Sequence, residues 1–190
     1  MRYAAGCPAS LFALRLCDDS ATAEGFDTGW TGRPRDGIMA AGIHRGETVL
    51  FNKGYEGDLT ATEAWRFLEE DPDALLIDVR TVAEWVYVGL PDISRLGRSV
   101  VCVQWNVWPQ MKVNPEFIPH LEAEGVTRER PLLLICRSGV RSRDAAVALT
   151  AAGFGPCYNV SDGFEGDLDD GKHRGVRNGW KVARLPWVQQ

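Results

Sequence analysis

Apolar positions gather along this chain in short runs that alternate with longer segments of mixed polarity. Five of the runs have the length and the flanking turn residues that are typical of strands. They cover residues 48–51, 75–80, 99–105, 132–135 and 157–160. The run Leu132–Ile135 is apolar at every position, which indicates a strand that is buried on both faces of a sheet.

The segments between these strands carry helix signals. Thr60 and Glu63 match a capping box, and Pro72 ends the helix that they start. Two further helices are predicted over residues 114–124 and 144–152, each followed by a glycine. Because strands and helices alternate, we expect an α/β fold with a five-stranded, mostly parallel sheet and helices on both faces.

The first part of the chain differs from the rest. Residues 1–47 have no sustained helical or strand period, so we expect a poorly ordered N-terminal extension before a domain over residues 48–190. Met39 lies shortly before the first predicted strand, which supports the hypothesis that the protein starts there. A flexible tail that starts at Met1 is the alternative.

Composition and charge argue against several classes of function. The 190 residues carry a formal net charge of −5, which argues against general nucleic-acid binding. No apolar run is long enough to span a bilayer, and the N-terminus lacks the pattern of a signal peptide, so we expect a cytoplasmic protein. The five cysteines lack CxxC spacing, and the three histidines are far apart. We therefore expect no disulfide framework, no metal site and no cofactor.

The strand Leu132–Ile135 leads directly into Cys136, and a helix follows after a short loop. A cysteine between the carboxyl end of a strand and the N-terminus of a helix lies where backbone amides and the helix dipole favour negative charge. Arg137 and Arg141 add two permanent positive charges, which also favour the reactive thiolate. The sequence therefore predicts an anion-binding site in which Cys136 is the nucleophile.

The other residues of this loop fit the same prediction. Gly139 tolerates the positive φ that a tight curl of the backbone requires. The hydroxyls of Ser138 and Ser142 can cap the following helix or bond an anion. Together with Val140, these residues present successive backbone amides that can point inward as a ring of donors.

The segment Cys136–Arg141, with the sequence C-R-S-G-V-R, resembles the active-site loop of the rhodanese-like sulfurtransferases. Two other motifs resemble signatures of that family and occur in the expected order. They are Leu76–Arg80 followed by Glu84 and Trp85, and Asn159–Phe164 followed by Gly179 and Trp180. The resemblance spans roughly residues 55–187.

The chain departs from the family pattern in two places. Gly89, Leu90 and Pro91 lie where the family often has Gly-His-Ile-Pro, so the histidine is missing. Residues 165–178 form a long insertion that is acidic and rich in glycine. Both departures concern substrate recognition at the outer wall of the pocket more than the fold or the chemistry.

The resemblance implies a rhodanese-like fold and sulfurtransferase activity. Cys136 would take a sulfane sulfur from a small anionic donor such as thiosulfate and hold it as a persulfide. It would then pass the sulfur to cyanide, to a thiol or to a sulfur-relay protein. The implied substrate-binding residues are Arg137, Ser138, Gly139, Val140, Arg141 and Ser142. Neither a nucleic acid nor a membrane is an expected partner.

Two other functions stay open. A cysteine phosphatase or an arsenate reductase of related fold has a similar loop, but the loop here has one residue fewer between cysteine and arginine. That shorter loop makes a smaller cradle, which suits a single sulfur better than a phosphoryl group. The other alternative is a sulfur carrier or protein-interaction module, for which the acidic insertion would be a docking surface.

Several further polar groups are expected to be structural. Asp78 and Arg80 follow a buried run and are predicted to brace the structure rather than to react. Cys102 and Cys157 lie in apolar strands, where a free cysteine behaves as a small hydrophobe. Residues 172–174 are basic, and we expect a solvated loop there rather than a basic lip over the site.

Overall fold

The computed structural model describes residues 54–189. All of them belong to the second of the two units into which the chain divides, residues 48–190. The predicted strand at residues 48–51, the predicted N-terminal extension and the alternative start at Met39 lie outside the described residues, so they stay predictions.

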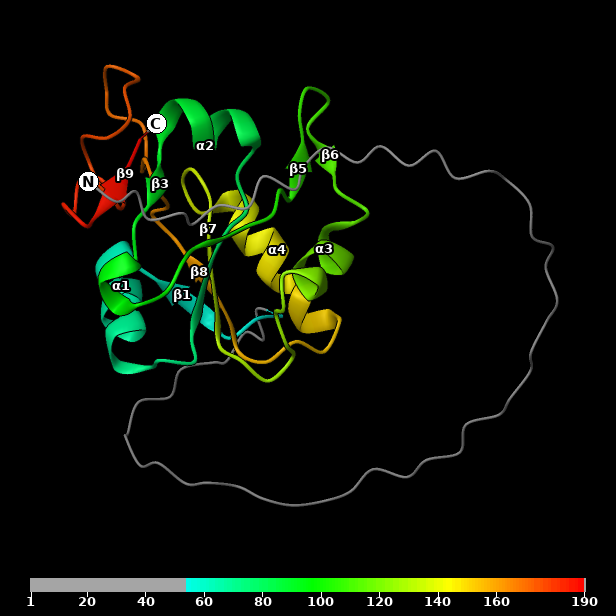
Figure 1. The fold of residues 1–190 in the computed structure, drawn as a ribbon. Coiled ribbons are helices and arrows are strands. Elements are labelled where there is room, and N and C mark those ends of the chain that lie inside the picture. The colour runs from blue at the N-terminus through cyan, green and yellow to red at the C-terminus, as the bar shows by residue number, and fades with distance from the viewer. Residues whose placement is uncertain (1–53, 190) are drawn as a thin grey trace, which may run out of the picture. The chain divides into compact units, whose positions relative to one another are not determined.

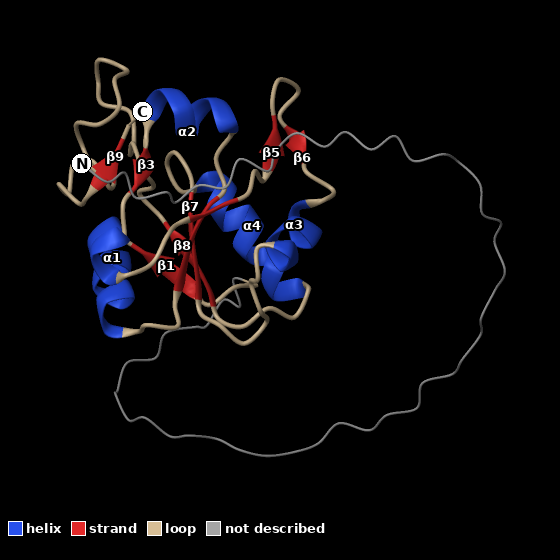
Figure 2. Ribbon diagram, viewed as in Figure 1, coloured by secondary structure: helices blue, strands red, loops and turns tan. Residues whose placement is uncertain are grey.

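A five-stranded sheet forms the centre of the described unit (Figure 2). Its strands are β1 (Gly57–Leu59), β2 (Leu75–Asp78), β4 (Val101–Cys102), β7 (Leu132–Ile135) and β8 (Cys157–Val160). They lie in the order β1-β8-β7-β2-β4, and every neighbouring pair is parallel. The predicted α/β fold with a parallel sheet is confirmed. Because β7 is the central strand, it delivers Cys136 to the middle of the sheet's carboxyl edge.

Two strands differ from their predictions. β1 is not indicated by the sequence, because it is a three-residue edge strand that pairs with β8 on one side only. β4 is shorter than the predicted run 99–105, although two later amides continue its pairing. The Val103 amide donates to the Asp78 carbonyl, and the Trp105 amide donates to the Val79 carbonyl, each at 3.1 Å.

Within residues 54–189, four α-helices surround the sheet. They are α1 (Ala61–Glu70), α2 (Val82–Val88), α3 (Phe117–Ala123) and α4 (Val140–Ala151), and a 3₁₀ helix, η1, covers Ser94–Leu96. None of the helices in this part of the chain has the length and apolar character needed to cross a membrane. Two small antiparallel pairs complete the unit: β3 (Leu90–Pro91) with β9 (Trp187–Val188), and β5 (Asn106–Val107) with β6 (Lys112–Val113).

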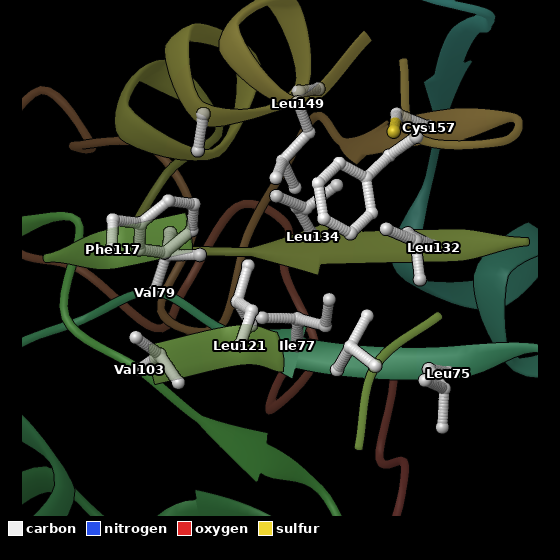
Figure 3. Packing of buried hydrophobic residues seen from close by; sticks show 14 of the residues in the cluster. Leu75, Ile77, Val79, Val103, Phe117, Leu121, Leu132, Leu134, Leu149 and Cys157 are labelled. Atoms are coloured by element: carbon white, nitrogen blue, oxygen red, sulfur yellow. The ribbon is translucent and has the colours of Figure 1, made fainter. Parts of the chain in front are cut away.

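Helices cover both faces of the sheet, as predicted (Figure 1). On one face α3 and α4 pack against alternate residues of β2 and β7, and Figure 3 shows Leu149 of α4 pointing toward Leu134 of β7. On the other face α1 packs against Leu133 and Ile135, together with the buried Trp180. Successive side chains of β7 point to opposite faces of the sheet, so this four-residue strand contributes to the hydrophobic core on each face.

The capping box at the start of α1 is present as predicted. Thr60 Oγ1 accepts a hydrogen bond from the Glu63 amide at 3.3 Å, and Glu63 Oε2 accepts one from the Thr60 amide at 2.7 Å. The same device starts α2, where Thr81 and Glu84 form a second capping box. The sequence prediction omitted α2, although this Thr-x-x-Glu pattern was available to indicate it.

α4 begins at Val140, four residues before the predicted start at Asp144. Gly139 makes the early start feasible, because its φ of +84° turns the chain from the strand directly into the helix. A Cβ at this position would lie 2.0 Å from the Ser161 carbonyl oxygen, so a side chain does not fit. Gly139 is also the N-cap and no side chain caps the helix, so the predicted capping by Ser138 or Ser142 is wrong.

α3 also differs at its start, since it begins at Phe117 rather than at Asn114. Asn114 Oδ1 instead accepts a hydrogen bond from the Glu116 amide at 3.0 Å, which closes a turn ahead of the helix.

Candidate active site

Cys136 follows β7 directly, and its residue surface is 1% exposed. It lines a cavity of about 740 Å³ at the carboxyl end of the sheet. The loop residues Arg137, Ser138, Val140 and Arg141 line the same cavity. Figure 1 shows α2 and the β5–β6 hairpin at this end of the molecule. The structure therefore brings most of the predicted site residues together around one cavity.

The backbone of the Cys136 loop (residues 136–142) is tied back by the segment that follows β8. The Phe164 amide donates to the Cys136 carbonyl at 2.8 Å, and the amides of Glu165 and Gly166 donate to the Arg137 carbonyl at 3.0 and 3.1 Å. In a trans peptide the carbonyl and the next amide point in opposite directions. The amides of Arg137 and Ser138 therefore point away from this segment, as a ring of donors requires.

Ser142 lies inside the first turn of α4, with no exposed surface. Its Oγ is 3.2 Å from Cys136 Sγ and donates to Asn159 Oδ1 at 2.7 Å. Asn159 Nδ2 in turn donates to Asp58 Oδ1 at 2.8 Å, which fixes the orientation of the amide. Tyr55 donates to the same oxygen, and burial together with this bond raises the pKa of Tyr55 to about 12. A chain of hydrogen bonds thus holds the Ser142 hydroxyl next to the sulfur.

Arg141 is held by a glutamate of α2. Its Nη1 and Nη2 donate to Glu84 Oε2 and Oε1 at 2.8 and 2.6 Å, in a bidentate pair whose side chains are 17% and 19% exposed. Burial opposes the ionisation of Glu84, but the bonds from Arg141 and from the Thr81 amide outweigh it and lower the carboxyl pKa to about 2. Arg141 therefore links α2 to the Cys136 loop, and both of its terminal nitrogens are already bonded.

Two other arginines of the cavity have no ion pair within the described residues. Arg137 is exposed at the mouth of the cavity. Arg174, from the insertion over residues 165–178, also lines the cavity, and its Nη1 donates to the Gly166 carbonyl. Lys172 and His173 are not among the lining residues. The prediction of a wholly solvated loop is therefore wrong for Arg174, because the bond to Gly166 anchors it at the cavity.

The sequence does not indicate that α2 and the β5–β6 hairpin contribute to the outer wall of the cavity. Trp108 and Met111, at the tip of the β5–β6 hairpin, line it from one side, and Ala83 and Val88 of α2 also contribute. Trp108 is 65% exposed, so its side chain is available to the cavity rather than packed in the core. Only the tertiary fold brings the hairpin next to Cys136.

The other expected structural residues lie away from the cavity. Asp78 and Arg80 are fully buried and form a bidentate pair, in which Arg80 Nη2 lies 2.6 Å from Asp78 Oδ2 and also donates to the Gly89 carbonyl at 2.7 Å. Leu90, which replaces the family's histidine, pairs with Val188 and is not among the lining residues. The outer wall thus departs from the family pattern at the insertion and not at Leu90.

Cys136 and Cys157 are free cysteines, and among the cysteines of the described residues Cys136 alone lines this cavity. Burial raises the pKa of the Cys157 thiol, which disfavours a thiolate there. No cluster of three or more His, Cys, Asp or Glu side chains in residues 54–189 is arranged to hold a metal ion.

A family model described as "STR4 middle domain" matches residues 56–190. Among solved structures, Rv0390 from M. tuberculosis is 47% identical, with a TM-score of 0.67, and the match covers 72% of this chain and 99% of that one.

Two curated relatives also match about two thirds of this chain. The uncharacterized protein RC0915 of Rickettsia conorii is 34% identical over 68% of this chain and 95% of its own length. Rhodanese-like domain-containing protein 4, chloroplastic, of Arabidopsis thaliana is 28% identical over 68% of this chain, but only over 25% of its own length. This chain thus spans most of the first relative and about a quarter of the second.

Proposed function

Because this chain belongs to the rhodanese-like family, we propose that it is a sulfurtransferase in which Cys136 carries the transferred sulfur as a persulfide. One observation carries the proposal. Cys136 is a free cysteine at the base of a cavity, in a loop whose carbonyls are bonded away from it and whose neighbours include arginines. That environment suits a negatively charged sulfur donor and stabilises negative charge on a bound sulfur.

The reaction has two half-reactions. In the first, the Cys136 thiolate attacks the outer sulfur of a donor such as thiosulfate; the new S–S bond forms while the donor S–S bond breaks, and sulfite leaves with the electron pair. In the second, cyanide or a thiolate attacks the outer sulfur of the persulfide, which restores the Cys136 thiolate. Sulfur is transferred without any other oxidant or reductant.

The loop residues have distinct proposed roles. The backbone amides from Arg137 to Ser142 stabilise the charge on the persulfide, and the Ser142 hydroxyl, whose proton goes to Asn159, contacts the sulfur at 3.2 Å. Arg137 orients the anionic donor, because its guanidinium is exposed and has no ion pair within residues 54–189. Arg141 adds positive charge, but its main role is to hold the loop against Glu84.

The proposed partners are a small anionic sulfur donor and an acceptor, either cyanide, a small thiol or a sulfur-relay protein. The Cys136 thiol must stay reduced between turnovers, so the proposal places the protein in a reducing compartment such as the cytosol. Cys136 lines the cavity together with the exposed Arg137, and either kind of acceptor would approach the sulfur through that cavity.

Substitution of Cys136 tests the proposal. We expect Cys136→Ser to abolish thiosulfate:cyanide sulfur transfer, while Cys102→Ser, a change at a cysteine that does not line the cavity, retains it. Circular dichroism shows whether each variant is folded. Full activity in folded Cys136→Ser refutes the proposal.

The same proteins test the phosphatase alternative. Hydrolysis of a phosphomonoester by the wild type, lost in Cys136→Ser and accompanied by no sulfur transfer, would replace the sulfurtransferase assignment with that alternative. Sulfur transfer without such hydrolysis supports the proposal.

A further inference from the structure

The cavity above Cys136 is larger than thiosulfate requires. Its volume of about 740 Å³ lies within the range of roughly 300–1,000 Å³ that is typical of pockets for drug-sized ligands. Thiosulfate is a small, compact inorganic anion that would occupy only the region next to the sulfur. The remaining space is bounded by side chains outside the Cys136 loop, and their chemistry indicates what fills it.

One side of this space is apolar. Trp108 and Met111 reach it from the tip of the β5–β6 hairpin, and they are 65% and 39% exposed. Ala83 and Val88 of α2 line the same cavity, and so does Val140, which is itself more than half exposed. Large apolar side chains that remain exposed beside a reactive sulfur indicate a binding surface, because covering them with an apolar ligand is favourable.

The positive and negative charges of the residues that line the cavity do not sum to zero. The charges of Arg141 and Glu84 satisfy each other, as their bidentate bonds show. The remaining charged residues that line the cavity are Arg137, Arg174 and Glu165, and the Glu165 carboxylate also interacts with Lys181. The balance is positive, and Arg174 provides a cation that belongs to the insertion rather than to the Cys136 loop.

From these features we infer that the site takes an organic sulfane-sulfur donor with an apolar body and an anionic group, an inference that rests on the proposed sulfurtransferase function. Trp108 and Met111 hold the apolar body, and Arg174 binds the anionic group. Trp108, Met111 and Arg174 are therefore specificity-determining residues that lie outside the family's motifs. Persulfides and thiosulfonates of organic molecules are donors of this class.

The transfer step balances for either donor. With an organic persulfide, R–S–SH, the Cys136 thiolate attacks the outer sulfur, the donor S–S bond breaks, and R–S⁻ leaves while the proton stays on the transferred sulfur. With a thiosulfonate, R–SO₂–S⁻, the same attack releases the sulfinate R–SO₂⁻. In both cases the new bond joins Cys136 Sγ to the transferred sulfur.

Two thiosulfonates of different size test the apolar wall. We expect benzenethiosulfonate to exceed methanethiosulfonate in kcat/KM by about tenfold, after each rate is divided by the donor's rate with a free small thiol in solution. Trp108→Ala is expected to reduce this ratio to about one third or less. Val113→Ala is the matched control, since Val113 lies on the same hairpin, is exposed and does not line the cavity.

A carboxylated donor tests Arg174. We expect 4-carboxybenzenethiosulfonate to have a lower KM than benzenethiosulfonate with the wild type, and Arg174→Gln to remove that difference. Arg177→Gln is the matched control, because Arg177 lies in the same insertion but bonds Asp170 and is not a lining residue. If the KM difference between the two donors persists in Arg174→Gln, the proposed role of this arginine is contradicted.

The outcomes separate the inference from the proposed function. If folded wild-type protein transfers sulfur neither from thiosulfate nor from any of these donors, the proposed function fails and the inference fails with it. If sulfur is transferred but the ratio of the two thiosulfonates is near one, or is the same in Trp108→Ala, the inference alone is overturned. A high ratio that falls in Trp108→Ala and not in Val113→Ala supports it.

Discussion

The base and the rim of the cavity are built in different ways. The base, which consists of Cys136, Gly139 and Ser142, is buried, and its polar groups are bonded to residues from β8 and the segment after β8. The rim, which we define as Trp108, Met111 and Arg174, belongs to a hairpin tip and to an insertion.

This difference assigns the chemistry of sulfur transfer to the base and the selection of the donor to the rim. Every member of the base has neighbours that leave little freedom, so a substitution there disturbs the sulfur and the fold together. The rim has space around it, so a substitution there changes which molecule fits while the fold persists. The next three predictions test this division, from the largest expected effect to the smallest.

Gly139→Ala addresses the most constrained point of the base. The new Cβ would lie 2.0 Å from the Ser161 carbonyl oxygen at a φ of +84°, so the loop must move. A shift of about 1 Å in a reacting group can lower the rate by about a hundredfold, and we expect a loss of that order in kcat/KM. Stopped-flow or steady-state sulfur transfer measures it.

Gly97→Ala is the matched control for this substitution. Gly97 also has a positive φ, +71°, but a Cβ there has nothing within 4 Å. Left-handed strain alone costs about 1–2 kcal/mol of unfolding free energy, and no loss of activity should follow. Equal activity in Gly139→Ala and Gly97→Ala would contradict a tightly fixed base.

Glu84→Gln tests the link between α2 and the base. The change keeps a capping side chain at this position but removes the ion pair with Arg141. Because the pair is partly exposed, we expect the unfolding free energy at pH 7 to fall by about 1–3 kcal/mol, less than for a fully buried pair. Chemical denaturation measures the change, and Glu122→Gln, in a pair that is about half exposed, should change it by less than about 1 kcal/mol.

The effect of Glu84→Gln depends on pH. The pKa of Glu84 is lowered from 4.5 to about 2 in the folded protein, so the ionised carboxylate is favoured in the folded state. Its stabilising contribution is full above about pH 5 and is lost as the pH falls through 4.5 toward 2. The difference in stability between wild type and variant should therefore shrink over that interval. A difference that stays constant would show that the ion pair is not its cause.

Trp108→Ala is expected to change the unfolding free energy by less than about 0.5 kcal/mol, because its side chain is mostly exposed. Trp180→Ala provides the contrast, since Trp180 is fully buried, packs edge-on against Trp65 and donates to the Pro186 carbonyl. Loss of a buried tryptophan costs about 3–5 kcal/mol. Thermal unfolding compares the two variants, and similar losses would contradict the exposed, loosely packed position of Trp108 at the rim.

Local patterns account for what the sequence predicts correctly. Leu132–Ile135 is apolar throughout, and Thr60 is three residues before Glu63, so a buried strand and a capped helix follow from neighbouring residues. β1 carries no such pattern, because its three residues join the sheet through backbone bonds to β8.

Some features of the candidate site can likewise be predicted from local sequence patterns, and others cannot. The position of Cys136 between a strand and a helix is visible in the sequence. The pairing of Arg141 with Glu84, 57 positions away, is not, and neither is the approach of Trp108 to the cavity. Both depend on how separate elements pack, and many pairings satisfy the same charge pattern.

Detection of the sulfur on its carrier tests the central claim most directly. Wild-type protein is incubated with thiosulfate, the excess donor is removed, and peptides are analysed by mass spectrometry under non-reducing conditions. We expect a gain of about 32 Da, the mass of one sulfur atom, on the peptide that contains Cys136, and its loss after addition of cyanide. No such gain on Cys136, or a gain on Cys102 or Cys157 instead, would contradict the account.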